Sequence, residues 1–200
     1  MSKICIIPPE LLPVSMELAR KNLRVDGDEL DELITTWVHG VTAALEHEIG
    51  QCLMPQTWLV TLDRFPPAGG ERAGWRQDSI PVSAIDLPHP VLEVESLTYV
   101  DQAGAAQVLD PGAYVLRRAR YESALVPTIG AAWPAVAAGS EIAVRVRCGY
   151  GETSDSTPAN VRLYILAKLV EQFDPVTRTE RGTVQSAFID RLLDACRSYR

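Results

Sequence analysis

The pattern of apolar and polar positions changes its period twice along the chain. Between residues 28 and 49 apolar residues recur about every 3.6 positions, which predicts an amphipathic helix. From residue 57 to residue 148 short runs alternate with a period of two and are separated by turn signals, which is typical of β-strands. A helical pattern returns after Pro158. We therefore predict an α+β fold, in which N- and C-terminal helices pack as a small helical layer with an inserted antiparallel β-sheet.

The opening helices carry clear end signals. Ser15 is placed to cap a short helix over "MELARKNL", with Val14 and Ala19 spaced as a hydrophobic staple. In the long helix over 28–49, acidic residues fill the first turn, where the helix dipole favours them, and Gly50 is placed to end it.

The central part of the chain reads as a series of strands with no helical pattern between them. This order predicts antiparallel pairing. The expected strands cover residues 57–63, 79–82, 94–100, 107–109, 114–117, 124–126 and 142–148.

We expect one domain over residues 1–200, with a helical part (1–54), a β insertion (55–150) and a second helical part (157–200). The first and last helices need each other's apolar faces, which favours a single domain over two. A final amphipathic helix is predicted over 185–199.

The segment "VRLYILAKLVEQF", residues 161–173, is more apolar than a surface helix requires. Nine of its thirteen residues are apolar, which exceeds one helical stripe. Burial between subunits would account for this excess, and so would a deep position in the core of the chain.

Composition and charge narrow the range of functions. The chain is 46% hydrophobic and 22% charged, which is ordinary for a globular protein. Its net charge of −7, from 19 basic and 26 acidic residues, argues against tight non-specific DNA binding. The longest uncharged run, residues 123–140, is interrupted by prolines and glycines, so we expect no membrane-spanning helix.

No constellation of residues indicates catalysis, a cofactor or a metal. Gly149 and Gly151 follow a strand and precede a helix, but no lysine or third glycine completes a phosphate-binding loop, so a structural turn is the better interpretation. The four cysteines have no paired spacing, and His39, His47 and Cys52 lack further ligands beside them. Arg145 and Arg147 point the same way from their strand and could meet a partner's acids or a nucleic acid, or stay solvated. We predict that the protein is not an enzyme and uses no cofactor.

The order of several motifs resembles the head–tail connector, or adaptor, proteins of long-tailed double-stranded DNA phages, prophages and related gene-transfer particles. The resemblance begins with "NLRVDGDELDELITTWVHGVTAALEHEIGQCLMPQTWLVTLDRFP", in which the helix-to-strand junction carries Gly50, Leu53, Gln56, Thr57 and Trp58. It continues through "VESLTYVDQAGAAQVLDPGAYVL", "LVPTIGAAWPAV" and "IAVRVRCGYG" to "LLDACRSYR", where Cys196 stands in place of the more usual proline. The resemblance covers nearly the whole chain.

The resemblance implies a virion structural protein at the head–tail junction, made in the cytoplasm of a host bacterium. Members of this family form a ring, generally of twelve subunits, beneath the portal protein. The ring extends the channel for double-stranded DNA, which passes without sequence-specific binding, and presents a surface to the stopper or tail-completion protein. An acidic channel would keep DNA from sticking. The alternatives are a small enzyme or ligand-binding domain that uses the β insertion, and a tail-completion protein of the same fold.

The resemblance also implies where contacts would lie, since helices of this family pack between subunits and the C-terminal segment engages the portal. The candidate subunit-interface residues are Trp37, Val161, Tyr164, Ile165, Leu169 and Phe173. The candidate portal-contact residues are Phe188, Leu192 and Tyr199.

Overall fold

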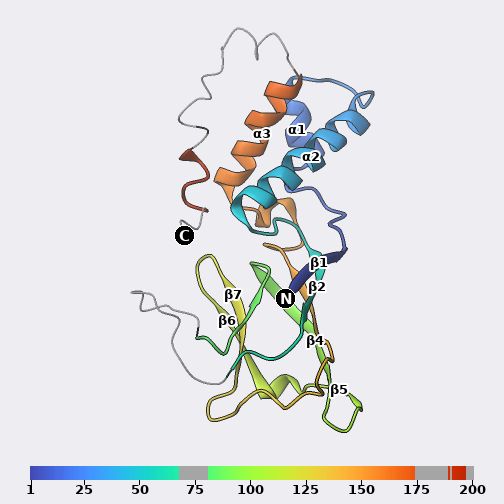
Figure 1. The fold of residues 1–200 in the computed structure, drawn as a ribbon. Helices are drawn as coiled ribbons and strands as arrows, with labels where there is room; N and C mark the ends of the chain where they lie inside the picture. The colour runs from blue at the N-terminus through green and yellow to red at the C-terminus, as the bar shows by residue number, and fades with distance from the viewer. Residues whose placement is uncertain (68–80, 174–188, 190, 197–200) are drawn as a thin grey trace. The chain divides into compact units, whose positions relative to one another are not determined.

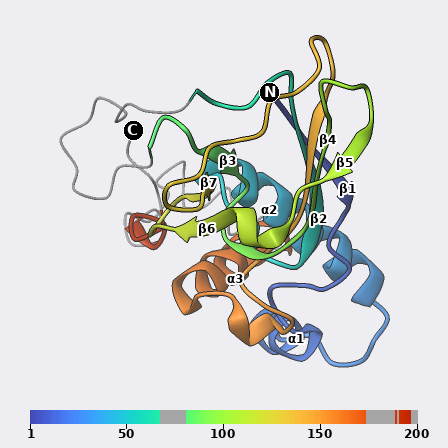
Figure 2. The same ribbon diagram turned by 90° about the horizontal axis from the view of Figure 1, so that it is seen from below.

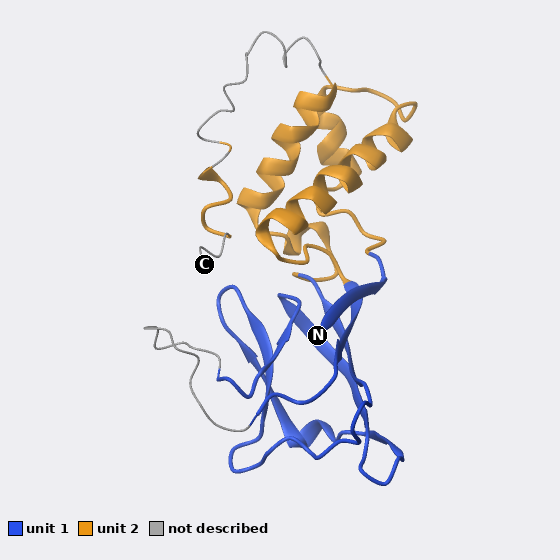
Figure 3. Ribbon diagram, in the orientation of Figure 1, with its two compact units in different colours: residues 1–8, 56–149 blue, residues 9–55, 150–200 orange. Residues whose placement is uncertain are grey.

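The fold is α+β, as predicted, and divides into two compact units. A computed structural model describes residues 1–67, 81–173, 189 and 191–196. One unit comprises residues 1–8 and 56–149 and holds the strands, and the other comprises residues 9–55 and 150–200 and holds the helices (Figure 3). We call them the β unit and the helical unit. The helical unit is therefore built from two segments of the chain that the β unit separates.

The β unit contains two antiparallel sheets (Figure 1). The first has five strands in the order β1-β2-β8-β4-β5: β1 (Ser2–Ile7), β2 (Gln56–Leu62), β8 (Ile142–Cys148), β4 (Val91–Val100) and β5 (Ala106–Val108). The second has three strands in the order β3-β7-β6: β3 (Ile85–Leu87), β7 (Ser123–Pro127) and β6 (Tyr114–Arg118). Strands β6 and β7 lie side by side in both views (Figures 1 and 2).

The burial of the side chains of β8 alternates, as its sequence predicts. Ile142, Val144, Val146 and Cys148 are fully buried, while the arginines between them are not. Arg145 forms an ion pair with Glu95 of the neighbouring strand β4, and Thr57 Oγ1 donates a weak hydrogen bond to the same carboxylate. Arg145, on the outer face of this sheet, is therefore paired with an acidic residue of its own chain.

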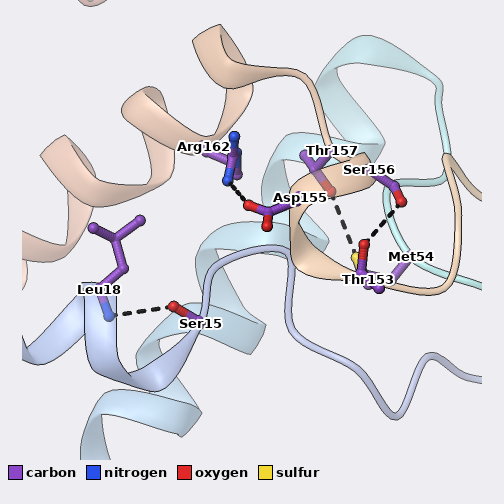
Figure 4. A network of polar contacts seen from close by, with 8 residues as sticks. All are labelled: Ser15, Leu18, Met54, Thr153, Asp155, Ser156, Thr157 and Arg162. Atoms are coloured by element: carbon purple, nitrogen blue, oxygen red, sulfur yellow. Dashed lines mark hydrogen bonds and ion pairs between the residues drawn. The ribbon is translucent and has the colours of Figure 1, made fainter.

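The helical unit contains α1 (Met16–Leu23), α2 (Asp31–Ile49) and α3 (Ala159–Phe173). The cap of α1 is confirmed, because the Leu18 N–H donates to Ser15 Oγ at 3.3 Å (Figure 4). The predicted end of α2 is confirmed too, because Gly50 adopts a left-handed conformation with φ 68° and its N–H donates to the Glu46 carbonyl. Helix α2 begins at Asp31, three residues later than predicted, and Asp31 forms an ion pair with Arg20 of α1.

Side chains from α1, α2 and α3 form one core. Its fully buried members are Val14, Ala19, Ile34, Val38, Leu53, Val161, Ile165, Leu169 and Leu193. The expectation that the opening and closing helices share their apolar faces is therefore confirmed. Short polar contacts fix the turn before α3, where Thr157 Oγ1 donates to the Met54 sulfur and Asp155 pairs with Arg162 (Figure 4).

The structure differs from the prediction at two strands. Residues 2–7, which the sequence places in the helical part, form strand β1 and pair with β2. Strand β3 (Ile85–Leu87) replaces the strand expected over 79–82, of which residues 79 and 80 lie outside the described residues. Two 3₁₀ turns, Pro111–Ala113 and Ser154–Ser156, complete the described elements.

The glycine pair after β8 acts as a turn. Gly149 and Gly151 have φ of 142° and 157°, a conformation that other residues rarely adopt. A Cβ atom on Gly151 would lie 2.5 Å from Ser156 Oγ, so a side chain does not fit there. The chain passes from the β unit to the helical unit between these two glycines.

None of the helices in the described ranges is long and apolar enough to cross a membrane.

Candidate functional site

The candidate interface residues on α3 fall into two groups. Val161, Ile165 and Leu169 have no exposed surface and belong to the core of the helical unit. For these three, the structure favours the deep core position, one of the two explanations that the sequence left open. Their burial within the chain accounts for much of the apolar excess of α3.

The other candidates lie at or beside a groove between α2 and α3, which pack against each other (Figure 1). The groove has a volume of about 380 Å³. Trp37 and Tyr164 line it from the two helices, and the Trp37 ring meets the Phe173 ring edge-on with centroids 6.1 Å apart. The full lining is Thr36, Trp37, Gly40, Val41, Ala44, Leu45, Glu48, Tyr164, Lys168 and Gln172.

The sequence pattern explains why the groove is open. Helix α2 turns Ile34, Val38, Leu45 and Ile49 into the core. A second row, starting at Trp37 and continuing through small residues to Glu48, follows the adjoining face of the same helix. Because the side chains in the middle of this second row are small, α2 and α3 leave an apolar hollow there.

Polar side chains also line this groove. Lys168 Nζ lies 3.0 Å from Glu171 Oε2 and 5.6 Å from the centre of the Tyr164 ring. The Lys168 ammonium is therefore held over the aromatic wall by a cation–π contact and an ion pair. Sequence reasoning named Trp37 and Tyr164 but missed Gly40, Ala44 and Lys168, whose role depends on how two helices distant in the sequence pack.

The candidate portal-contact residues lie in or beside the C-terminal segment. Phe188 and Tyr199 are outside the described residues, as is most of the helix predicted over 185–199. Leu192 is partly buried against the helical core, and its carbonyl accepts a hydrogen bond of 2.7 Å from the Asn160 amide. The Gln51 amide donates in the same way to the Cys196 carbonyl at 2.8 Å. These two hydrogen bonds therefore hold the described residues 191–196 against the rest of the helical unit.

A smaller hollow of about 210 Å³ lies in the β unit, beside the turn between β7 and β8. It is lined by Arg117, Trp133, prolines and small residues. Among the described residues, no group of three or more His, Cys, Asp or Glu could hold a metal ion. The residues at this hollow do not provide the converging polar groups that a ligand site requires.

His89 is the one histidine of the β unit, and it is buried. Its Nδ1 lies 2.9 Å from Ser123 Oγ. Burial lowers the pKa of His89 below its ordinary value, while hydrogen bonds to the backbone at Arg120 and Glu122 and the Glu122 charge oppose this effect. Since Ser123 is itself buried, the pair joins the link between β3 and β4 to the start of β7 rather than presenting a nucleophile.

We expect the stability of the β unit to fall as the pH drops below about 6.5, the ordinary pKa of histidine. A lowered pKa in the folded state means that the unfolded state binds the proton more readily, so stability is full above that pH and is lost below it. The slope from His89 is at most about 1.4 kcal/mol per pH unit. Urea unfolding between pH 5 and 8 should show this slope, and His89→Gln should reduce it. The exposed His39 supplies the control, and an equal change in His39→Gln would contradict the assignment.

Comparisons with known proteins find similar chains among the solved structures. No family model and no curated protein matches the sequence. A chain in the neck of an empty gene transfer agent particle, computed with C6 symmetry, is similar with a TM-score of 0.77 at 16% identity. A chain in the virion of a native gene transfer agent particle is similar with a TM-score of 0.74 at 18% identity. A chain in the neck of the native particle, computed with C12 symmetry, has a TM-score of 0.69 at 18% identity.

Each of these matches covers 100% of this chain and 97% of the other. At such low identity the likeness shows a shared fold. It extends over both units, so the combination of helical unit and β unit is common to the three neck and virion chains.

Proposed function

We propose that this protein is a structural subunit of a phage-like particle, placed in its neck between head and tail. The observation that carries the proposal is the full-length similarity of fold to chains of gene transfer agent necks and virions. The ordered motifs of the sequence, which resemble head–tail connector proteins, support the same role independently. Among the described residues, no group of three or more His, Cys, Asp or Glu could hold a metal ion.

The finer proposal is a connector that forms a ring under the portal protein and joins the head to the stopper or tail-completion protein. Two of the similar structures were computed with C6 or C12 symmetry, which supports a ring of repeated subunits. Twelve copies would then surround a channel through which double-stranded DNA passes. The net charge of −7 favours passage over adhesion, because like charges repel the phosphate backbone.

Within the ring, Trp37, Tyr164 and Phe173 are the residues we propose at the subunit interface. They are aromatic, and they lie at or beside an apolar groove of the helical unit. Aromatic side chains are enriched at the centres of protein interfaces. For the portal contact we propose the C-terminal segment, of which Leu192 is the described member.

Mixing the protein with its cognate portal is expected to produce ring density directly below the portal in negative-stain electron microscopy. The portal alone supplies the control, because any added layer must come from this protein. A protein that stays monomeric beside the portal, and that gains thermal stability from a small ligand instead, would rule out the connector and favour a ligand-binding domain.

A further inference from the structure

Gly40 occupies a place in α2 where none of the described residues requires a glycine. Its φ is not among the positive values, and a Cβ atom added there would meet no atom of the described residues within 4 Å. Glycine in the interior of a helix is less stable than alanine. A residue that costs stability and relieves no clash with the described residues is explained if another element must approach the helix closely at that point.

The groove around Gly40 indicates what that element is like. Its lining combines Gly40, Val41 and Ala44 with the aromatic side chains of Trp37 and Tyr164. One acidic and one basic side chain, Glu48 and Lys168, also line it. This lining has no single sign of charge to attract a nucleic acid, whereas its apolar part suits aliphatic side chains presented by a helix.

The same helical unit also exposes aliphatic side chains of this kind outside the groove. Leu163 of α3 is 45% exposed and Leu18 of α1 is 38% exposed. The two helices pack on each other, and the Asn22 amide of α1 donates to the Leu166 carbonyl of α3 at 2.9 Å. Leu163 directly precedes Tyr164, so it points about 100° away from the groove side of the helix.

We propose that the groove between α2 and α3 receives Leu163 and Leu18 of a second copy of this chain. The proposal rests on the proposed ring and names the two surfaces that meet in it. Because the groove and the leucines are different surfaces of one subunit, the contact is head-to-tail. A head-to-tail contact leaves a free groove at one end and free leucines at the other, so it adds copies until the ring closes. Gly40 then allows the leucines of the neighbour to approach the backbone of α2.

Filling the groove should block assembly without harming the fold. Gly40→Leu places a side chain in the hollow and replaces a poor helix former by a good one, so the thermal midpoint should stay level or rise. Rings below the portal should be lost, and self-association in sedimentation experiments should weaken by about tenfold or more. Ala43→Leu adds the same bulk on an exposed α2 position outside the groove and should assemble like the wild type.

Two matched variants test the surface that carries Leu163. Leu163→Gln should also prevent rings, whereas Leu33→Gln, at a leucine of 43% exposure outside the groove, should not. Mixing Gly40→Leu with Leu163→Gln restores one working contact, so pairs should form but no rings. Normal rings from Gly40→Leu would overturn the inference while leaving the proposed function intact.

Cross-linking tests the contact without the portal. In a Cys5→Ser background, protein with Ala44→Cys is mixed with protein carrying Lys21→Cys, an exposed position one helical turn from Leu18, so that both leucines stay in place, and treated with a short bismaleimide. A cross-linked dimer should form in the mixture and not in either protein alone, and Ala43→Cys in place of Ala44→Cys should give much less. If the wild type forms no ring with its portal, the proposed function fails, and this cross-link alone decides the contact. Equal yields at positions 43 and 44 would contradict it.

Discussion

Replacing Ile165 by alanine is expected to lower the free energy of unfolding of the isolated protein by about 2–5 kcal/mol. Ile165 has no exposed surface and lies in the core of the helical unit, where α1, α2 and α3 meet. Removing its three outer carbons leaves a cavity that rigid neighbouring helices fill only in part. Urea unfolding followed by circular dichroism at 222 nm, at a concentration where the protein is monomeric, measures the loss.

The exposed neighbour Leu163 provides the control for this experiment. Leu163→Ala should lower the free energy of unfolding by only about 1 kcal/mol, since Leu163 is 45% exposed and loses less buried surface. The pair separates the two explanations that the sequence left open for the apolar excess of α3. If Ile165→Ala kept the stability of the monomer and abolished only the assembly, Ile165 would be an interface residue after all.

Sequence reasoning predicted those features whose causes are local. Ser15 caps α1 because its side chain accepts from a backbone N–H three residues on, and Gly50 ends α2 because it adopts a left-handed conformation. The alternation of β8 similarly follows from one buried face. In each case a few adjacent residues determine the geometry, so their pattern was sufficient.

Features that depend on distant partners were missed or misplaced. Strand β1 has no alternately buried face, since five of its six residues are exposed, and it forms by pairing with β2, about fifty residues later. The candidate site was only half predictable for the same reason. Aromatic residues such as Trp37 were recognisable as interface candidates. The part that Gly40 plays in the groove, in contrast, depends on how two helices pack. A local sequence pattern does not predict a groove between two helices that are distant in the sequence.

The C-terminal segment shows a related limit. Its amphipathic pattern predicted a helix, and the family resemblance implied that this helix contacts the portal. Leu193, however, is fully buried in the helical core, and the side chains of Asn160 and Gln51 donate hydrogen bonds to the backbone on either side of it. An apolar face in a sequence indicates that something covers it, but not whether the cover is the chain itself or a partner. A truncation before Gln185 would therefore remove part of the core together with any portal contact.

Point substitutions at two adjacent leucines separate these roles. Leu193→Ala is expected to lower the free energy of unfolding by about 2–5 kcal/mol, because a fully buried side chain leaves a cavity among α2 and α3 residues. Leu192→Ala should cost clearly less stability, because that side chain is only partly buried. Urea unfolding of the two variants, alongside the wild type, gives both values.

Portal binding is then compared at a temperature where all three proteins are folded. If the C-terminal segment engages the portal, Leu192→Ala should weaken binding more than its small loss of stability explains, while Leu193→Ala should weaken it less. Binding losses that merely follow the loss of stability in both variants would remove Leu192 from the portal contact. A stable Leu193→Ala protein would show instead that residues 191–196 leave the helical unit in solution, which would free both leucines for a partner.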